Sequence, residues 1–405
     1  MSTIRIGLAI AGLALAAATA PATAQKKYDP GASDKEIRIG HIGPYSGPAS
    51  AYGRIGHAIK AYFDKVNADG GINGRKIAFI TLDDGYNPAK TVEQARKLVE
   101  QEEVLLLFQT LGTPSNSAIH KYMNQRKVPQ LFIATGATKW GDPKNFPWTM
   151  GWQPSYQSEA KIYARHLLEN TPDAKVAVLY QNDDYGKDYL EGFEVGLGDK
   201  AATMIVAKAS YEVTDPTVDS QMVSLKSSGA DVFFNVTTPK FAAQAIKKAA
   251  ELGWKPVHYL NSVSNSAASV MRPAGVEAGI GVISAFYVED PSDPKFQRTP
   301  GYREWEAWMD KYHRDGDKKE GFNVYGYTVA QTMVQVLKQA GDQLTRANVM
   351  KQAASLKNLK LPLLLPGMAI NTSATDFFPF EQGQMRKFNG SSWEAIGDVI
   401  DATAG

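Results

Sequence analysis

The residues best suited to hold a ligand gather around a loop rich in glycine and proline. The loop Gly43–Gly53 (GPYSGPASAYG) stands between the apolar run Ile37–Ile42 and the amphipathic segment Gly53–Ala68. A loop of this kind leaves backbone N–H groups free at a helix N-terminus, and these groups favour an anionic ligand group. The stretch contains no nucleophile–base pair and no metal-ligand spacing. It therefore indicates binding of a small molecule, not its conversion.

Catalytic and metal-binding patterns do not occur elsewhere in the sequence. There is no G-x-S-x-G, H-E-x-x-H, P-loop or dinucleotide fingerprint, and the six histidines are scattered. The pair Asp83-Asp84 has the composition of an acid or metal site. It stands just before Asn87-Pro88, however, where a loop and helix cap is the interpretation we prefer. We expect no enzyme activity, no metal and no cofactor.

The N-terminus has the pattern of an export signal. Arg5 precedes the apolar run Ile6–Ala18, which is too short to span a bilayer, and Ala22-Thr23-Ala24 fits a cleavage site. The sequence thus predicts a signal peptide over residues 1–24 and a mature chain from Gln25. The chain has no cysteine, so we expect neither disulfides nor a lipid anchor on cysteine. An exported protein without an anchor is retained by an outer membrane, which indicates the periplasm.

The length of the chain indicates how many lobes it forms, and its charge indicates which kinds of partner it can bind. The chain has 405 residues, more than one hydrophobic core usually supports, so two lobes are expected. Its 44 basic and 42 acidic residues give a net charge of +2, and no run of lysine or arginine exceeds two. A nucleic-acid partner normally requires a clustered basic face, so we expect none.

Strand-like and helix-like segments alternate along most of the chain, which predicts α/β layers with parallel sheets. The expected strands are Ile37–Ile42, Ile77–Leu82, Val104–Phe108, Leu131–Ala134, Val176–Tyr180, Met204–Ala207, Val232–Val236, Val257–Leu260 and Val282–Phe286. The expected helices are Gly53–Ala68, Ala89–Gln101, Pro114–Arg126, Gln157–Glu169, Lys187–Gly198, Thr217–Ser228, Lys240–Gly253, Tyr302–Arg314, Gly321–Ala340 and Thr345–Leu356.

The alternation pauses at Thr138–Tyr156, a stretch rich in proline and tryptophan that we interpret as a crossing between two lobes. The tail Met368–Ile400 returns to short strands and turns such as Asn389-Gly390. We expect a first lobe over residues 25–154 and 287–378, and a second over 155–286 and 379–405. Two such lobes, joined by a multi-strand hinge, would bind a ligand in the cleft at the carboxyl ends of their strands.

Four motifs together resemble one known family. They are GPYSGPASAYG, NADGGINGRKI, LDDGYNP and QNDDYGKDYLEGF, in that order. In this combination the chain resembles the periplasmic branched-chain (Leu/Ile/Val) amino acid binding proteins of ABC-type importers. The resemblance covers Glu36 to Trp393. It implies the type I periplasmic binding protein fold, with two Rossmann-like lobes.

The resemblance also implies ligand-binding residues in the first lobe. Tyr52 matches the family's loop aromatic that closes over the ligand, or it caps its own helix. Thr113 matches the hydroxyl that binds the ligand carboxylate, or it is a helix N-cap. Gly136, Ala137 and Thr138 match the turn whose backbone and hydroxyl contact the carboxylate and amine.

Two further matches fall in the second lobe. Tyr185 corresponds to a ligand-facing tyrosine, or to plain packing, and Thr237 stands where the family often has another aromatic. The aromatic residues between the lobes, Trp140, Trp148, Trp152 and Tyr156, fit hinge packing better than ligand stacking.

The sequence departs from the family pattern at one feature, and this feature affects which ligand can bind. Family members place an acidic residue against the ligand's ammonium group, yet neither Tyr259–Ser269 nor Gln153–Gln157 contains Asp or Glu. A buried ammonium without a carboxylate is costly. The sequence therefore leaves two ligand classes open: a hydrophobic amino acid, with Asp183 or Asp184 supplying the missing charge, or a carboxylic acid without an α-amine, such as an aromatic acid.

The predicted function is that of a monomeric periplasmic binding protein that delivers its ligand to the membrane permease of an ABC importer. A ligand sensor that reports to a membrane receptor is an alternative on the same fold. An enzyme is not favoured, because no nucleophile, base or metal constellation is present.

Overall fold

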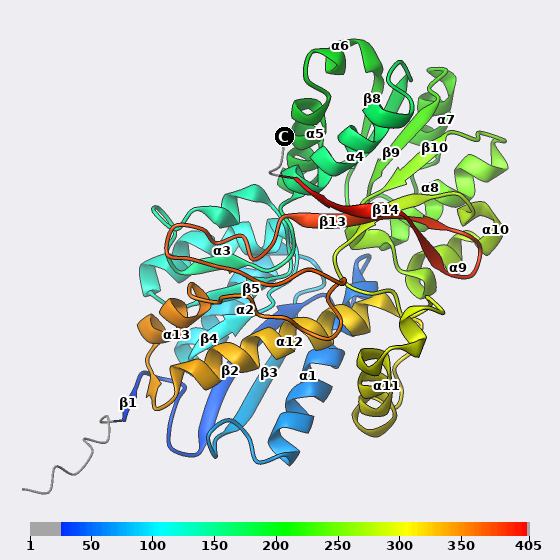
Figure 1. The fold of residues 1–405 in the computed structure, drawn as a ribbon. Helices are drawn as coiled ribbons and strands as arrows, with labels where there is room; N and C mark the ends of the chain where they lie inside the picture. The colour runs from blue at the N-terminus through cyan, green and yellow to red at the C-terminus, as the bar shows by residue number, and fades with distance from the viewer. Residues whose placement is uncertain (1–25, 403–405) are drawn as a thin grey trace, which may run out of the picture.

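The computed structural model describes residues 26–402, so the expected signal peptide lies outside the described residues. Two α/β lobes are stacked on one another, and the chain passes between them several times (Figure 1). A small parallel pair, β1 (Lys27–Tyr28) with β12 (Gln343–Leu344), ties the start of the described chain to the first lobe. Within residues 26–402 no helix is both long and apolar enough to cross a membrane.

The first lobe is built on a five-stranded sheet with the order β3-β2-β4-β5-β6, and all its pairings are parallel. Its strands are β2 (Glu36–Gly43), β3 (Lys76–Asp83), β4 (Leu106–Phe108), β5 (Gln130–Ile133) and β6 (Thr149–Gly151). Strand β2 is an interior strand, since Ile39 pairs with Phe79 on one side and Leu106 on the other. Its apolar run suits a strand buried on both faces.

Helices cover both faces of this sheet (Figure 1). They are α1 (Gly53–Ala68), α2 (Pro88–Arg96), α3 (Thr113–Arg126), α11 (Pro300–Tyr312), α12 (Gly321–Ala340) and α13 (Arg346–Ala353). Helix α1 buries Ile55, Ile59 and Phe63, which recur at helical spacing, and it packs against α12. The sequence-based bounds of α1 and α12 agree with the structure.

The second lobe has a seven-stranded sheet with the order β14-β13-β11-β10-β9-β7-β8. Its strands are β7 (Val176–Gln181), β8 (Ile205–Tyr211), β9 (Val232–Val236), β10 (Val257–Leu260), β11 (Ile283–Phe286), β13 (Gln382–Phe388) and β14 (Trp393–Asp401). The covering helices include α4 (Tyr156–Asn170), α5 (Asp184–Leu197), α7 (Asp219–Ser227) and α8 (Pro239–Glu251).

This second sheet is mixed, because the chain's last two strands form an antiparallel hairpin on its edge. The hairpin turns at Asn389-Gly390, where Gly390 has a φ of 99°, a conformation that favours glycine. Strand β13 pairs antiparallel with β11, so the last described strands lie in the second lobe, after the long excursion through α11, α12 and α13 (Figure 1). The lobe boundaries expected from the sequence stay a prediction.

Trp152 marks the first crossing between the sheets. It is fully buried, its indole N–H donates to Thr332 at 3.0 Å, and its ring packs edge-on against Tyr325, Tyr287 and Phe380. Strand β6, just before it, was not expected from the sequence, because a three-residue strand among prolines shows no periodicity. Trp152 thus packs in the hinge as predicted, whereas Tyr156 of the same predicted cluster lines a cavity between the lobes.

Candidate functional site

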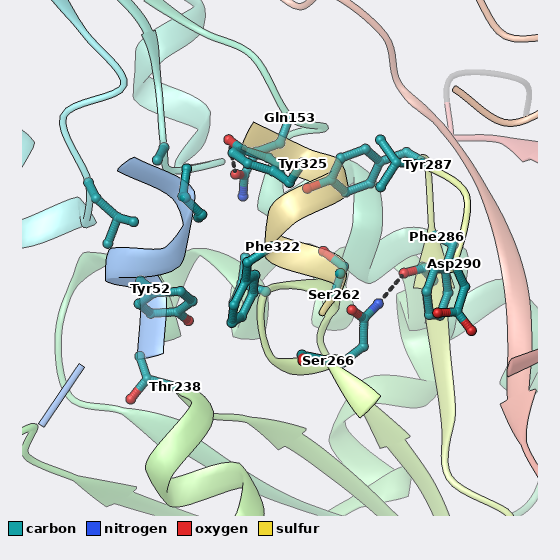
Figure 2. Close-up of a pocket in the computed structure, with 18 of the residues that line it drawn as sticks. Tyr52, Gln153, Thr238, Ser262, Ser266, Phe286, Tyr287, Asp290, Phe322 and Tyr325 are labelled. Atoms are coloured by element: carbon teal, nitrogen blue, oxygen red, sulfur yellow. Dashed lines mark hydrogen bonds between the residues drawn. The ribbon is translucent and has the colours of Figure 1, made fainter. Parts of the chain in front are cut away.

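A cavity lies between the lobes, at the carboxyl ends of the strands of both sheets (Figure 2). It holds about 860 Å³ not filled by protein atoms, part of which is open to solvent. The first lobe contributes Tyr52, Ile55, Tyr86, Leu111, Ala134, Gly321, Phe322 and Tyr325. The second lobe contributes Tyr156, Tyr185, Thr238, residues 262–263 and 265–267, Ala285 and Phe286, and the crossings contribute Gln153 and residues 287–291.

Aromatic rings dominate the walls. Tyr52 ends the 3-10 turn η1 (Ser50–Tyr52) that follows the glycine-rich loop, and its ring lies 5.2 Å from that of Phe322 at the start of α12. On the opposite side Tyr156 and Tyr185 lie edge to face at 5.3 Å. Aromatic walls of this kind favour a flat or branched apolar body.

The polar groups of the second lobe that line the cavity are mostly bonded within the protein. Ser262 donates its hydroxyl to Glu159 at 2.6 Å, and Ser266 donates to Glu320 at 2.6 Å. Asn265 donates its amide to the carbonyl of Ala285 at 3.2 Å (Figure 2). These bonds hold the loop after β10 in place.

The two carboxylates that line the cavity, Glu289 and Asp290, each accept hydrogen bonds from protein groups. Glu289 binds Arg386 at 2.8 Å, and Asp290 accepts from the backbone and hydroxyl of Ser292 and from the backbone of Trp393. Burial raises the pKa of both acids, and Arg386 opposes this shift. Among the described residues no Lys, Arg or His lines the cavity. An ammonium group bound here would meet no uncommitted carboxylate.

Glu159 is an acid that sequence reasoning missed. It lies on α4 just past Gln153–Gln157, the segment searched for an acid, and is almost fully buried. Its carboxylate accepts from the hydroxyls of Tyr163 and Tyr189 and from the backbone N–H and hydroxyl of Ser262. Burial raises its pKa, and these hydrogen bonds oppose the rise. It positions the Ser262 loop and does not itself line the cavity.

Two of the predicted site residues, Tyr52 and Tyr185, line the cavity together. Asp183 and Asp184, the acids proposed to reach an amino-acid ligand, do not line it. Asp183 caps α5 by accepting from the backbone N–H groups of Tyr185 and Gly186, and Asp184 pairs with Lys139 at 2.6 Å.

Thr113 is not among the lining residues. It is buried at the start of α3, where its hydroxyl bonds that of Thr135 at 2.6 Å. The hydroxyl of Tyr156 lies beside both threonines: burial raises its pKa to about 12, and hydrogen bonds from Thr135 and Thr113 oppose this. Tyr156 therefore separates Thr113 from the cavity.

The turn Gly136-Ala137-Thr138 is likewise not part of the lining and is covered by groups of the second lobe. A Cβ on Gly136 would fall 2.8 Å from the ring of Tyr156. Thr138 donates its backbone N–H and its hydroxyl to Asp188 on α5, at 2.8 and 3.0 Å. In this structure the turn holds a carboxylate of the chain itself.

Thr237 is fully buried behind the cavity, where its hydroxyl donates to Asn235 at 2.6 Å. Its neighbour Thr238, which begins the turn into α8, lines the cavity instead. A shift by one residue reverses the direction of a side chain in an extended segment.

The glycine-rich loop also holds a protein carboxylate. The backbone N–H groups of Tyr45 and Ser46 donate to Asp83, at 2.8 and 3.2 Å. Asp84 accepts from Thr91 and Ser115 in the core of the lobe, and Asn87 caps α2. Asp83 and Asp84 thus bond groups of the loops and the core, as the loop interpretation predicted, whereas the cap of α2 is Asn87 and neither aspartate.

Sequence reasoning missed the residues at the hinge end of the cavity, namely Gln153, Phe286, Tyr287, Phe322 and Tyr325. They come from two crossings, from the end of β11 and from α12, which are segments far apart in the chain. The sequence analysis proposed none of them as a ligand contact.

The sequence pattern of the periplasmic binding protein family matches residues 36–385. A relative described as Leu/Ile/Val-binding protein homolog 7 of Brucella abortus (strain 2308) is 24% identical over 348 residues, which cover 82% of this chain and 81% of that protein. A second, homolog 8 of Brucella melitensis, is 21% identical and covers 89% of this chain and 88% of its own length.

Solved structures share the fold. A branched chain amino acid ABC transporter protein from Thermus thermophilus with bound valine has a TM-score of 0.81 at 18% identity, covering 91% of this chain and 97% of that one. A fatty acid ABC transporter substrate-binding protein from Thermomonospora curvata has a TM-score of 0.79 at 23% identity, covering 94% and 97%. The expected type I periplasmic binding fold is confirmed.

Proposed function

The chain belongs to the periplasmic binding protein family, and we propose that it captures a small apolar carboxylate between its lobes and delivers it to the permease of an ABC importer. It acts by binding, not by catalysis. The export signal predicted for residues 1–24 supports a periplasmic location.

One observation supports this class of ligand: aromatic rings line the cavity, and the carboxylates in its wall already bond protein donors. Glu289 and Asp290 are bound by protein donors, and Asp183 caps a helix. Bringing an ammonium group into such a site would cost several kcal/mol of desolvation without an ion pair to offset it. An acid without an α-amine avoids this cost, so we favour it over a branched-chain amino acid.

The relatives support a carboxylate with an apolar body. Their names cite leucine, isoleucine and valine in one case and a fatty acid in another. These ligands share a carboxylate and a hydrocarbon portion and differ in the ammonium group. The aromatic walls around Tyr52 and Phe322 suit the shared hydrocarbon portion.

Delivery depends on closure of the lobes around the ligand, as is general for periplasmic binding proteins. Contacts between the lobes flank the cavity on two sides. Thr138 binds Asp188 on one side, and Glu320 accepts from Ser266 on the other. The closed surface would be the one that the permease recognises.

A thermal-shift screen of the purified mature protein tests this function. Hydrophobic amino acids, aliphatic acids and aromatic acids are compared at equal concentration. A ligand at a hundred times its Kd stabilises by about 2.7 kcal/mol and raises the melting temperature. We expect aliphatic or aromatic acids to give the largest shifts and to be recovered unchanged. No shift from any of the three classes, or consumption of the compound, would contradict the proposal.

A further inference from the structure

The polar end of the ligand site lies at the hinge, not at the turn that the sequence indicated. We propose that the ligand carboxylate is bound by the hydroxyl of Tyr287 and the side-chain amide of Gln153, one residue from each of two crossings between the lobes. This inference rests on the proposed function and specifies where in the cavity the acid lies.

Tyr287 presents a buried donor that no protein group uses. The side chain is 7% exposed, and its hydroxyl forms no hydrogen bond with any residue in the described part of the chain. Trp152 and Phe380 hold the ring from two sides, with centroids 6.2 and 5.5 Å away. Figure 2 shows the hydroxyl directed into the cavity. The hydroxyl therefore reaches the cavity with its donor free for a ligand.

Gln153 supplies a second donor nearby. Its side-chain oxygen accepts from the hydroxyl of Tyr325 at 3.1 Å, which fixes the orientation of the amide. The amide nitrogen then has no hydrogen-bond acceptor among residues 26–402, and the side chain is 6% exposed. Figure 2 shows Gln153, Tyr325 and Tyr287 along one edge of the cavity. Both free donors line the same cavity, and each can donate one hydrogen bond to a carboxylate oxygen.

The alternative location for the carboxylate is taken by protein groups. Tyr156 covers Gly136 and stands between Thr113 and the cavity, while Asp188 occupies the donors of Thr138. A ligand carboxylate at that turn would have to displace a buried tyrosine and a bonded aspartate. At the hinge end it displaces no protein group.

The test measures binding of four probes by calorimetry: leucine, phenylalanine, 4-methylpentanoate and 3-phenylpropanoate. Tyr287→Phe removes one oxygen, and loss of a hydrogen bond to a charged group should weaken binding of the two amine-free acids by about ten- to a hundredfold. Gln153→Glu keeps the acceptor for Tyr325 but replaces the free donor by a negative charge. It should weaken their binding by more than about a hundredfold.

Tyr327→Phe is the matched control, because Tyr327 is a buried tyrosine of α12 whose hydroxyl bonds Glu304 outside the cavity. It should bind like the wild type. The melting temperature of ligand-free Tyr287→Phe should equal that of the wild type, because the lost hydroxyl has no partner in the described chain.

The outcomes separate this inference from the proposed function. If the wild type binds an amine-free acid and Tyr287→Phe binds it equally well, the hinge site is wrong and the proposed function stands. If the wild type binds none of the four probes, both are overturned. Loss of affinity in Tyr287→Phe with unchanged ligand-free stability supports the hinge site.

Discussion

Thr138 and Asp188 are joined across the cleft by two hydrogen bonds, since the backbone N–H and the hydroxyl of Thr138 both donate to one carboxylate oxygen, at 2.8 and 3.0 Å. Thr138 follows β5 in the first lobe, and Asp188 lies on α5 in the second. Gln157 binds the other oxygen of Asp188 at 2.9 Å. A turn with the sequence of a ligand-carboxylate site thus connects the two lobes directly.

Removing the hydrogen bonds between Thr138 and Asp188 should favour the open form, in which the two lobes are separated. We predict that Asp188→Ala increases the radius of gyration of the ligand-free protein, measured by small-angle scattering. Ligand affinity should fall by about tenfold, because the closed state becomes less populated. Asp188→Asn keeps one acceptor oxygen and should show a smaller change. Tighter binding by Asp188→Ala would mean instead that the freed turn accepts the ligand's carboxylate.

We expect Glu159 to stabilise the folded state, because its carboxylate accepts hydrogen bonds from several buried donors. Glu159→Leu leaves the backbone N–H and the hydroxyl of Ser262 and the hydroxyl of Tyr189 without their acceptor, so we expect a loss of about 2–4 kcal/mol in urea unfolding. Glu159→Gln retains an oxygen, and its amide can donate to hydroxyl oxygens, so the loss should stay within about 1 kcal/mol. Equal losses in the two variants would contradict this account.

Glu320 should give a measurable pH dependence. Burial raises its pKa, and hydrogen bonds from Ser266, Ser269 and the backbone of Phe322 oppose the shift. Between the ordinary carboxyl pKa and this raised value, the folded state holds more protons than the unfolded state, so the contribution of Glu320 to stability falls as pH rises. Glu320→Gln should therefore gain stability relative to the wild type from about pH 5 to pH 8.

Unfolding measured at both pH values checks this sign. A relative stability of Glu320→Gln that falls with rising pH would show that the hydrogen bonds outweigh burial.

The ion pair of Arg386 with Glu289 joins β13 to the crossing after β11 and is almost fully buried. Arg386→Met should cost about 3–5 kcal/mol at pH 8, because it leaves a buried carboxylate without its partner. Burial already raises the pKa of Glu289, and loss of Arg386 should raise it further. The cost should accordingly shrink toward pH 5, where Glu289 takes up a proton. A loss of stability in Arg386→Met that is the same at pH 8 and at pH 5 would contradict this account of the ion pair.

The layers of the fold were predictable because long segments have clear periodicity. Helices α1 and α12 and strand β9 have the bounds expected from the sequence. Strand β6 was missed because three residues among prolines carry no period.

The site was predictable only in part. Tyr52 and Tyr185 were found because each lies in a recognisable motif that places it on the cavity wall. Tyr287 and Gln153 were not, since their role depends on crossings that meet only in three dimensions. The hydrogen bonds between Thr138 and Asp188 could not be predicted either, because a sequence does not show that a carboxylate of the protein itself fills a predicted anion site.

The central claim is that the cavity binds an apolar carboxylate and gains nothing from an ammonium group. The most direct measurement is isothermal titration of the mature protein with leucine and with 4-methylpentanoate, its deaminated analogue, in the same buffer. We predict that 4-methylpentanoate binds at least as tightly as leucine, because the two carboxylates that line the described cavity, Glu289 and Asp290, already bond protein donors. Tight binding of leucine together with no binding of 4-methylpentanoate would show that the ammonium is recognised, and would contradict the claim.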